Sequence, residues 1–391
     1  MTSHGAVVPS GAEAAFPEIE LKGRMSAAQV ALAAKNIDVM IVTGPENIFY
    51  LTGQQTPGYY TYQALLVPTE GDPVFIVREL ELNNLVANSY LENIHPYLDN
   101  ADPVSVTVDL IRELGWSGKR LAIDDRGWFL PVSVYKALLE SFGELGNGAG
   151  VIESLRAVKS PAEQSKIIQA ATYVEAGMNA GLSAIRAGAS ENDIVSEMMS
   201  KAIAAGSEYV GMEPLMASGP RCGVPHGTWR RRVIEAEDPV FLEMAGCHDR
   251  YHAVLMRSAW MGTPPDVARR MMDCCLEGLD AALSALKPGN RCVDVHDACQ
   301  AVVDRHGFTE NYKKRTGYCV GISFAPDWGE GNILSLYTGV DTELAPGMVF
   351  HVPPALRVYG EFTVGVSETA IVTDDGCKTL SSINRELHLV S

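Results

Sequence analysis

Positive charge is scarce in this sequence. Its 391 residues include 31 lysines and arginines against 48 aspartates and glutamates, a formal net charge of -17. Nucleic acids and anionic membranes are bound by basic surfaces, so we expect neither as a partner. Cysteine is absent from the N-terminal half, and the eight cysteines beyond it form no C-x-x-C pair. We therefore expect reduced thiols that pack as small apolar side chains.

Long apolar runs are missing as well. No stretch is long enough to span a bilayer, and the first residues lack the basic start and apolar core of a secretory signal. These absences predict a cytoplasmic protein. Hydrophobic residues nevertheless make up 47% of the sequence, enough to build full cores, and the length suits two domains.

The first part of the chain reads as an α/β domain. Residues 1–18 are small, polar and proline-containing, which predicts a loose N-terminal arm. Strands and helices alternate over residues 19–152, which favours an open mixed sheet. Within it, 64–68 and 73–77 flank the turn Glu70-Gly71-Asp72 and predict a hairpin. The predicted strands cover 37–42, 64–68, 73–77 and 121–125, and the predicted helices cover 25–34, 106–114 and 131–142.

Residues 153–391 form the second predicted domain, which contains a weak internal repeat. Ala184-Ile-Arg-Ala-Gly188 ends one predicted helix, and Asp193 lies near the start of the next. The same arrangement returns 101 residues later, at Ala285-Leu-Lys-Pro-Gly289 and Asp294. Each copy has a basic residue and a glycine where a helix ends. The repeat predicts two related halves around a pseudo-two-fold axis, with the functional site between them.

Polar side chains interrupt the apolar segments at several points. His226 follows a glycine- and proline-rich loop, where its side chain can face a cleft. Glu243 closes an apolar strand of a predicted hairpin, and His252 opens the second strand. An ionised carboxylate inside such a strand is costly unless it is paired. Glu243 therefore either forms an ion pair with Arg250 or Arg257, or it has a chemical role.

Two further strands near the C-terminus carry one such group each. Glu368 interrupts the strand at 363–373, and His351 interrupts the strand at 348–352. We expect these two strands to pair in antiparallel orientation. One positioned carboxylate and one histidine suffice for hydrolysis, because the carboxylate can act as base or nucleophile while the imidazole passes a proton to the leaving nitrogen.

In these segments the chain resembles the pita-bread family, which includes prolidases, Xaa-Pro aminopeptidases, methionine aminopeptidases and creatinase. The resemblance implies a creatinase-type N-terminal α/β domain and an α+β pita-bread catalytic domain. Four phrases carry it in register: Leu155-Arg-Ala-Val-Lys-Ser-Pro-Ala-Glu163, Gly317-Tyr-Cys-Val-Gly321, Leu344-Ala-Pro-Gly-Met-Val349 and Ser367-Glu-Thr-Ala-Ile-Val-Thr373.

The metal-dependent members of that family bind two divalent ions through Asp, Asp, His, Glu and Glu. Valine and proline occupy two of the five positions and offer no side-chain donor, so we expect no two-metal site and no cofactor. A single divalent ion held by His226, Glu243, His252 and Glu368 is an alternative. The five ligand positions fall on Glu243, Val254, Tyr318, Pro353 or Pro354, and Ser367 or Glu368.

The replacement of the metal-ligand residues, with His226 retained, resembles creatinase, which works without metal. The finer sequence pattern is similar to ectoine hydrolase-like proteins. That similarity implies hydrolysis of a cyclic amidine or another small amide-like C–N bond, and an acidic pocket suited to a zwitterionic or cationic molecule. Residues 54–62 depart from the usual ectoine hydrolase stretch. The phrases involved are Ser218-Gly-Pro-Arg221, Pro225-His-Gly227, Leu242-Glu-Met-Ala-Gly-Cys247, Arg250-Tyr-His252, Pro326-Asp-Trp-Gly-Glu330 and Ser367-Glu368.

The resemblance assigns roles to these residues. Glu243 attacks the C–N carbon or activates water, His226 is the general acid and base, and Glu368 completes the catalytic set. In the homodimer that the resemblance implies, the N-terminal domain of one subunit lies near the active site of the other. The predicted substrate-binding residues are His252, Tyr318, His351, Asp327, Trp328 and Glu330, with Tyr60 and Arg78 reaching a partner's site.

Three other functions fit the same residues. A metal-dependent Xaa-Pro aminopeptidase or dipeptidase would hold divalent ions and lose activity with a chelator. A creatinase-like amidinohydrolase would cleave an amidino group without metal. A catalytically dead binding module would turn over no C–N substrate.

Overall fold

The structure is a computed structural model that describes residues 9–391. The chain divides into two compact units, the first ending at Arg156 and the second beginning at Ala157. We expected the second domain to begin at 153, but α6 (Val151–Arg156) packs on α1 and α2 of the first unit. Among the described residues, no helix has the length and apolar character required to cross a membrane.

The first unit is a six-stranded mixed sheet in the order β4-β3-β2-β1-β5-β6. The predicted hairpin is confirmed as the antiparallel pair β2–β3, and β1 pairs in parallel with β5. All four residues of β1 are buried, so the helices must cover both faces of the sheet. The elements are α1 (Glu18–Ala34), β1 (Val39–Val42), α2 (Pro45–Thr52), β2 (Ala64–Pro68), β3 (Val74–Arg78), α3 (Leu82–Asn88), β4 (Ile94–Tyr97), α4 (Pro103–Glu113), β5 (Leu121–Ile123), α5 (Val132–Phe142) and β6 (Gly146–Asn147), with short 3-10 turns at Pro57–Tyr60 and Glu79–Glu81.

The predicted loose arm is ordered over the part that the structure describes. Gly11 N–H donates to Val86 O at 2.9 Å, which ties the segment to α3. Phe16 is 3% exposed and packs between the ring of Phe49 and the guanidinium of Arg24. A buried aromatic anchor outweighs the polar composition of this segment. Residues 1–8 of the predicted arm lie outside the described residues.

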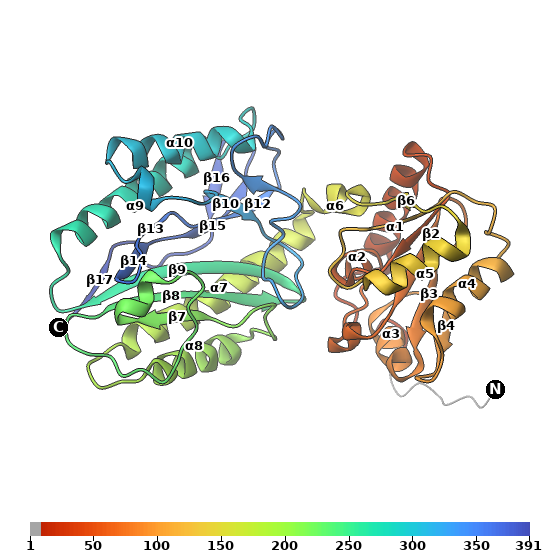
Figure 1. Cartoon of the computed structure of the whole chain (residues 1–391), viewed down its shortest axis with the longest axis horizontal. Coiled ribbons are helices and arrows are strands. Elements are labelled where there is room, and N and C mark those ends of the chain that lie inside the picture. The colour runs from red at the N-terminus through yellow and green to blue at the C-terminus, as the bar shows by residue number, and fades with distance from the viewer. Residues whose placement is uncertain (1–8) are drawn as a thin grey trace. The chain divides into compact units, whose positions relative to one another are not determined.

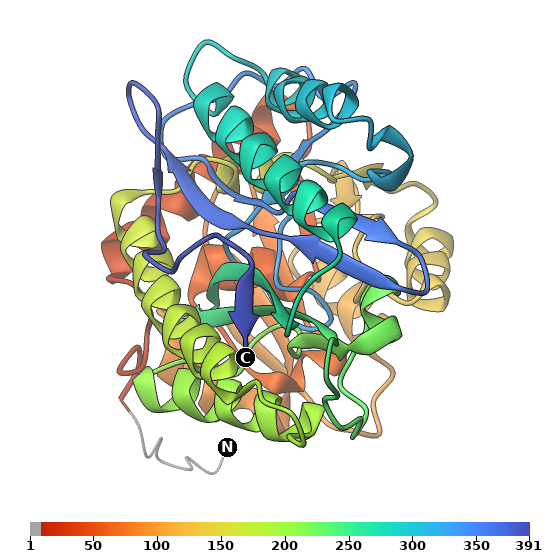
Figure 2. The same ribbon diagram turned by 90° about the vertical axis from the view of Figure 1, so that its left-hand side faces the viewer.

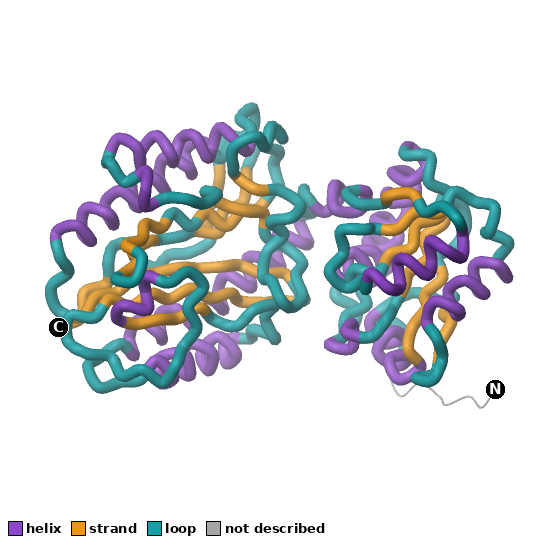
Figure 3. The backbone as a smooth tube through the Cα atoms, viewed as in Figure 1, coloured by secondary structure: helices purple, strands orange, loops and turns teal. Residues whose placement is uncertain are grey.

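The second unit places its strands between two pairs of helices. Figure 1 shows α9 and α10 along one side of the strands and α7 and α8 along the other, and the turned view in Figure 2 agrees. In Figure 3 the strands of this unit lie between the helical layers. The elements are α7 (Pro161–Ala184), α8 (Glu191–Ala205), β7 (Leu215–Ser218), β8 (Pro239–His248), β9 (Tyr251–Met261), α9 (Asp266–Ala285), α10 (Cys292–Arg305), β10 (Gly317–Cys319), β11 (Ser335–Leu336), β12 (Val349–Val352), β13 (Ala355–Val358), β14 (Phe362–Gly365), β15 (Glu368–Val372), β16 (Cys377–Thr379) and β17 (His388–Val390), with 3-10 turns at Gly219–Gly223 and Thr309–Asn311.

The internal repeat corresponds to two matching helix pairs. α7 ends at Ala184 and α8 begins at Glu191, while α9 ends at Ala285 and α10 begins at Cys292. Asp193 and Asp294 occupy the same position in the first turn of α8 and α10, and each completes a capping box. The first pair leads into the sheet β17-β9-β8-β7, and the second leads into β11-β10-β12-β15-β16.

The hairpin β8–β9 has two buried faces with different neighbours. Leu242 and Met244 point toward α7, where they meet Gly181 and Gly177. Glu243 lies between them in the strand and therefore points to the opposite face. We expected Glu243 to close its strand, but β8 continues to His248 and places Glu243 in the middle of ten residues.

Candidate active site

Glu243 is held at the centre of its sheet face by strands on both sides. It pairs in register with Leu215 of β7 and with Met256 of β9. Its side chain is half-buried, and no described residue donates a hydrogen bond to its carboxylate or forms an ion pair with it. Burial raises the pKa of Glu243, while Lys314 and Arg357 oppose that rise. The carboxylate thus faces two cations that it does not contact.

Arg357 reaches this face from β13. Ala355, two residues earlier on the same side of that strand, packs in one apolar cluster with Phe241 and Met256. Phe241 and Glu243 share a face of β8 because they are two residues apart. Arg357 is half-buried, its Nε has no hydrogen-bond partner among the described residues, and it forms no ion pair there.

Lys314 approaches from the segment before β10. Its Nζ donates to the carbonyl oxygen of Pro353 at 2.8 Å. Burial and the neighbouring Arg357 together lower the pKa of Lys314 to about 8, although Glu243 opposes the shift. The ammonium group therefore carries its charge at neutral pH beside a second cation.

His226 borders the same two cations. It lies in an exposed turn with a left-handed φ of 54°, a conformation that is uncommon outside glycine. The preceding loop sits tightly on the β13–β14 turn, where a side chain at Gly223 would meet the backbone of Val358 and Gly360. Burial, Arg357 and Lys314 lower the pKa of His226, and Asp327 raises it. His226 makes no hydrogen bond with Glu243, but a neutral imidazole at this position can accept a proton.

Tyr318 belongs to a series of hydrogen-bonded side chains that runs from Trp328 to Ser367, the residue before β15. Trp328 Nε1 donates to the Tyr318 hydroxyl at 2.9 Å, and that hydroxyl lies 2.9 Å from His351 Nδ1. His351 Nε2 lies 2.7 Å from Ser367 Oγ, which accepts from the backbone N–H of Met256 at 2.8 Å. Burial raises the pKa of Tyr318 well above its ordinary value, and Glu243 raises it further. Tyr318 is therefore a neutral hydroxyl close to Glu243.

The hydrogens shared by Tyr318, His351 and Ser367 can be counted, and the count shows which side chain has a hydrogen left to donate. Burial holds the pKa of His351 well below its ordinary value, so the ring is neutral and carries one N–H. Tyr318, His351 and Ser367 together carry two hydroxyl hydrogens and one N–H hydrogen. The two hydrogen bonds that join these side chains use two of the three hydrogens, so one hydroxyl hydrogen is left to point elsewhere. Ser367 is fully buried and needs its own hydrogen for His351. The remaining donor is the Tyr318 O–H, on the side of Glu243.

Comparison with known proteins assigns this arrangement to a family. Residues 165–374 match the metallopeptidase family M24, and residues 24–158 match the creatinase/prolidase N-terminal domain. The chain belongs to the metallopeptidase family M24. The predicted creatinase-type N-terminal domain and pita-bread catalytic domain are thereby confirmed, and the family is one of hydrolases.

Several M24 relatives are similar over nearly the whole chain. Ectoine hydrolase from Halomonas elongata is 30% identical over 95% of this chain and 98% of its own length. Xaa-Pro dipeptidase from Lactobacillus helveticus is 24% identical over 92% of this chain and 96% of its own. The solved prolidase from Thermococcus sibiricus has a TM-score of 0.86 at 24% identity, covering 95% of this chain and 99% of that protein, and it supports the fold.

The side chains at the five M24 ligand positions do not fit a pair of metal ions. Val254 and Pro353 offer no side-chain donor, and both are buried. The hydroxyls of Tyr318 and Ser367 belong to the chain through His351. Glu243 alone is a carboxylate, and it faces two cations. Over residues 9–391, no group of three or more His, Cys, Asp and Glu side chains comes together in a way that could hold a metal ion.

Glu368 does not join the residues around Glu243. Its carboxylate pairs with Arg257 at 3.0 Å and with Arg385 Nε at 3.1 Å. Arg257 and Leu242 are register partners in the β8–β9 pair, so their side chains lie on the same face of it. That face is turned toward α7 and away from Glu243. Burial raises the pKa of Glu368, and the two guanidinium groups oppose the rise. The expected catalytic grouping of Glu368 with Glu243 and His226 is therefore wrong in its geometry.

Two other predicted substrate-binding residues have complete sets of protein partners. His252 is fully buried, lies 2.9 Å from Arg250 O through Nδ1, and accepts from Gly211 N–H through Nε2 at 3.0 Å. Burial lowers the pKa of His252 to about 3. Glu330, 2% exposed, accepts from Lys159 Nζ at 2.7 Å and from the N–H of Ile322 at 3.1 Å. His252 therefore cannot join His226, Glu243 and Glu368 in holding a single divalent ion. Direct contact of Glu330 with a substrate does not fit this geometry either.

The loop from Asp327 to Glu330 places two other predicted residues beside Tyr318. Asp327 is exposed and influences the pKa of both His226 and Tyr318. Trp328 is 2% exposed and reaches the site only through its N–H to Tyr318. Gly329 lies against the Tyr318 ring, where any side chain would collide with it.

Tyr60 and Arg78 lie in the first unit. Tyr60 is 76% exposed and lies close to Arg78, whose guanidinium binds Asp99 in bidentate fashion. Their contribution to a partner's site in a homodimer stays a prediction.

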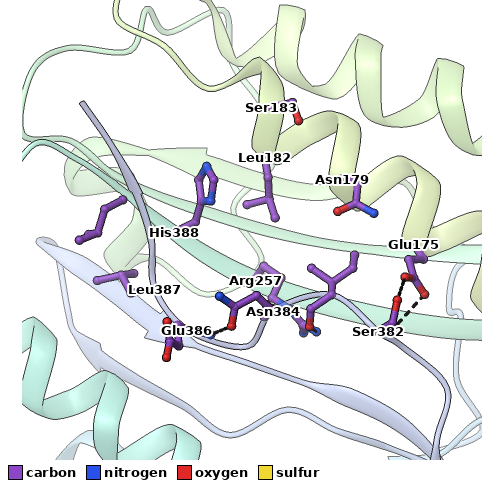
Figure 4. Close-up of a pocket in the computed structure, with 12 residues that line it drawn as sticks. Glu175, Asn179, Leu182, Ser183, Arg257, Ser382, Asn384, Glu386, Leu387 and His388 are labelled. Atoms are coloured by element: carbon purple, nitrogen blue, oxygen red, sulfur yellow. Dashed lines mark hydrogen bonds between the residues drawn. The ribbon is translucent and has the colours of Figure 1, made fainter.

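A groove of about 580 Å³ opens on the α7 side of the second unit (Figure 4). It lies between α7 and the C-terminal segment, and Glu175 accepts hydrogen bonds from Ser382 across it. Arg257 lines the groove, whereas Glu243 and His226 do not. The groove therefore belongs to the face of Glu368.

Lys314 and Arg357 were missed by the sequence analysis, and they change its picture of an acidic pocket. Lys314 stands in the run Lys313-Lys314-Arg315, which has the appearance of a solvated surface. One signal was available for Arg357, since it interrupts the apolar run of residues 355–358, three residues after Pro354.

Proposed function

We propose that this M24 protein is a metal-independent hydrolase of a C–N bond in a small zwitterionic nitrogen compound. Ring opening of ectoine or hydroxyectoine is the reaction to test first. The observation that supports this most strongly is Glu243, a half-buried carboxylate without a hydrogen-bond partner among the described residues, opposite two cations and a tyrosine hydroxyl. The similarity to ectoine hydrolase supports the substrate class.

In the proposed mechanism Glu243 supplies the attack. Lys314 and Arg357 favour its ionised form although burial raises its pKa. The carboxylate either adds to the electrophilic carbon of the C–N group or removes a proton from a water molecule that adds instead. In both routes the elements of water are finally divided, with hydroxide on carbon and a proton on nitrogen.

The developing tetrahedral centre and the leaving nitrogen need two further groups. The Tyr318 O–H is fixed by Trp328 and His351, so it can donate to the substrate atom on which charge develops without reorganising. His226, neutral in the resting site, relays a proton to the leaving nitrogen. When Glu243 activates water, this is the proton that Glu243 has removed. When Glu243 adds to the carbon, the proton comes from a water molecule, and the hydroxide that remains cleaves the covalent intermediate. Glu368 has no part in this scheme, because its carboxylate is bound to Arg257 and Arg385 on the other face.

The test is a turnover assay on protein dialysed against chelator, with metal content measured on the same sample. Ectoine, hydroxyectoine, creatine and an Xaa-Pro dipeptide are offered separately, and products are identified by mass spectrometry. We expect ring opening of ectoine or hydroxyectoine at full rate without metal. Turnover of the dipeptide alone, abolished by chelator and restored by divalent ion, would instead favour an M24 peptidase. Turnover of creatine would indicate an amidinohydrolase, and turnover of none of them a binding module.

A further inference from the structure

Two cations on the Glu243 face lack the carboxylate partners that other buried cations have. Lys159, 1% exposed, pairs with Glu330 at 2.7 Å, and Arg257, also 1% exposed, pairs with Glu368 at 3.0 Å. Among residues 9–391, neither Lys314 nor Arg357 forms an ion pair. Both are half-buried, so their charges are only partly screened by water.

The charges around Glu243 do not balance. Lys314 and Arg357 contribute two positive charges and Glu243 one negative charge, so the three groups sum to +1. The cations also disfavour each other, because Arg357 lowers the pKa of Lys314. A second negative charge between them would relieve this repulsion and satisfy donors that the protein leaves unused.

The donors suit an oxygen anion. Lys314 Nζ uses one N–H on Pro353 O at 2.8 Å and keeps two for another acceptor. The Arg357 guanidinium is a planar fork whose geometry matches a carboxylate, and its Nε has no partner within the described chain. Since β13 carries Arg357 and β8 carries Glu243 across a shared apolar cluster, an anion bound here lies beside the attacking carboxylate.

We propose that Lys314 and Arg357 form the site that binds the carboxylate group of the substrate. The inference rests on the proposed function, because it orients a substrate whose C–N carbon then faces Glu243. It narrows the substrate class to small molecules that carry one carboxylate close to the C–N bond. A purely cationic amine or amidine is excluded, since Lys314 and Arg357 repel it.

A kinetic comparison tests this with the full-length protein and whichever compound of the turnover panel is hydrolysed. Lys314→Met should raise KM by roughly 10- to 100-fold, the scale of one lost hydrogen bond to a charged group, with a much smaller change in kcat. Lys313→Met is the matched control, because Lys313 is exposed and pairs with Glu310. The carboxamide of the same substrate should bind poorly to the parent and equally poorly to Lys314→Met. A normal KM in Lys314→Met would overturn the proposal.

A labelling experiment tests the carboxylate site even if no compound is turned over. The parent protein is reductively methylated at pH 8, and modification of Lys314 and Lys313 is followed by mass spectrometry. Acetate should slow labelling of Lys314 and leave Lys313 unchanged, while acetamide should slow neither. Equal labelling of Lys314 with acetate and acetamide would reject the carboxylate site, whatever the turnover assay gives. Because this arm uses no variant, misfolding of Lys314→Met cannot obscure it.

Discussion

Glu243 and Glu368 are two glutamates in the strands of one unit, and they differ in what surrounds them. Glu368 is fully buried on the face opposite to Ser367 and His351, and it is bound to Arg257 and Arg385. Glu243 faces the other way, is half-buried, and has two cations nearby but none in contact. The first carboxylate is paired with two guanidinium groups, and removing its charge would leave Arg257 as an uncompensated buried cation. The second carboxylate is left available for chemistry.

Replacing Glu243 tests the chemical side of this comparison and should give the largest effect. Glu243→Gln keeps the shape but removes the base or nucleophile, so kcat should fall by about 10²- to 10⁴-fold. The free energy of unfolding should not decrease, because a neutral amide is cheaper to bury than an unpaired carboxylate. Steady-state kinetics and urea unfolding measure the two quantities, with Glu361→Gln, at an exposed site, as control. Retained turnover would remove Glu243 from the mechanism.

Replacing Glu368 should give the opposite pattern. Glu368→Gln leaves Arg257 buried beside an uncharged partner, which should lower the free energy of unfolding by about 3–5 kcal/mol. The kcat of the folded protein should stay close to that of the parent. The same urea series measures the stability, and Glu361→Gln should remain within about 0.5 kcal/mol of the parent. Full stability with lost turnover would place Glu368 in the chemistry after all.

His226 tests whether the exposed turn belongs to the site of Glu243. His226→Ala should lower kcat by about 100-fold, the scale of a lost acid and base. His306→Ala is a control, since His306 lies in a surface pair with Glu277. A substrate with a better leaving nitrogen should recover part of the lost rate in His226→Ala. An unchanged rate would show that another group carries the proton.

The pH dependence should give the smallest effect and reports on the cations. The pKa of Lys314 is lowered to about 8 by burial and by Arg357, against the opposing influence of Glu243, Cys275 and Cys299. The charged form dominates below that pH and is lost above it. For a carboxylate substrate, kcat/KM should therefore fall about tenfold per pH unit above about 8. Lys314→Met should lack this limb, whereas Lys313→Met should keep it.

Much of the fold could be predicted because it follows from local patterns. The apolar runs at 64–68 and 73–77, on either side of a turn, predicted β2–β3, and the repeated helix ends predicted the two helix pairs. The end of β8 was missed because Gly246 reads as a strand breaker. The structure instead uses Gly246 for close packing, since a side chain there would collide with the backbone of Ala170 in α7.

The site was harder to predict, because a shift of one residue in a strand reverses the direction of every side chain. The sequence left the last M24 ligand position open between Ser367 and Glu368. The structure puts Ser367 on the side of His351 and Tyr318 and turns Glu368 toward Arg257. Lys314 and Arg357 depended on contacts between segments far apart in the chain, which no local pattern reports.

The hydrogen bonds that link Trp328, Tyr318, His351 and Ser367 make it difficult to restore a two-metal site by changing one residue at a time. Aspartate introduced at Val254 alone would add a carboxylate on the face of Glu243 with no ion to neutralise it. Glutamate at Ser367 alone would remove the hydroxyl group that His351 contacts through Nε2. It would leave the contact of Lys314 with Pro353 O unchanged. An engineer who wanted a metallopeptidase from this scaffold would have to exchange the side chains at Val254, Tyr318, Pro353 and Ser367 and remove two cations in a single step.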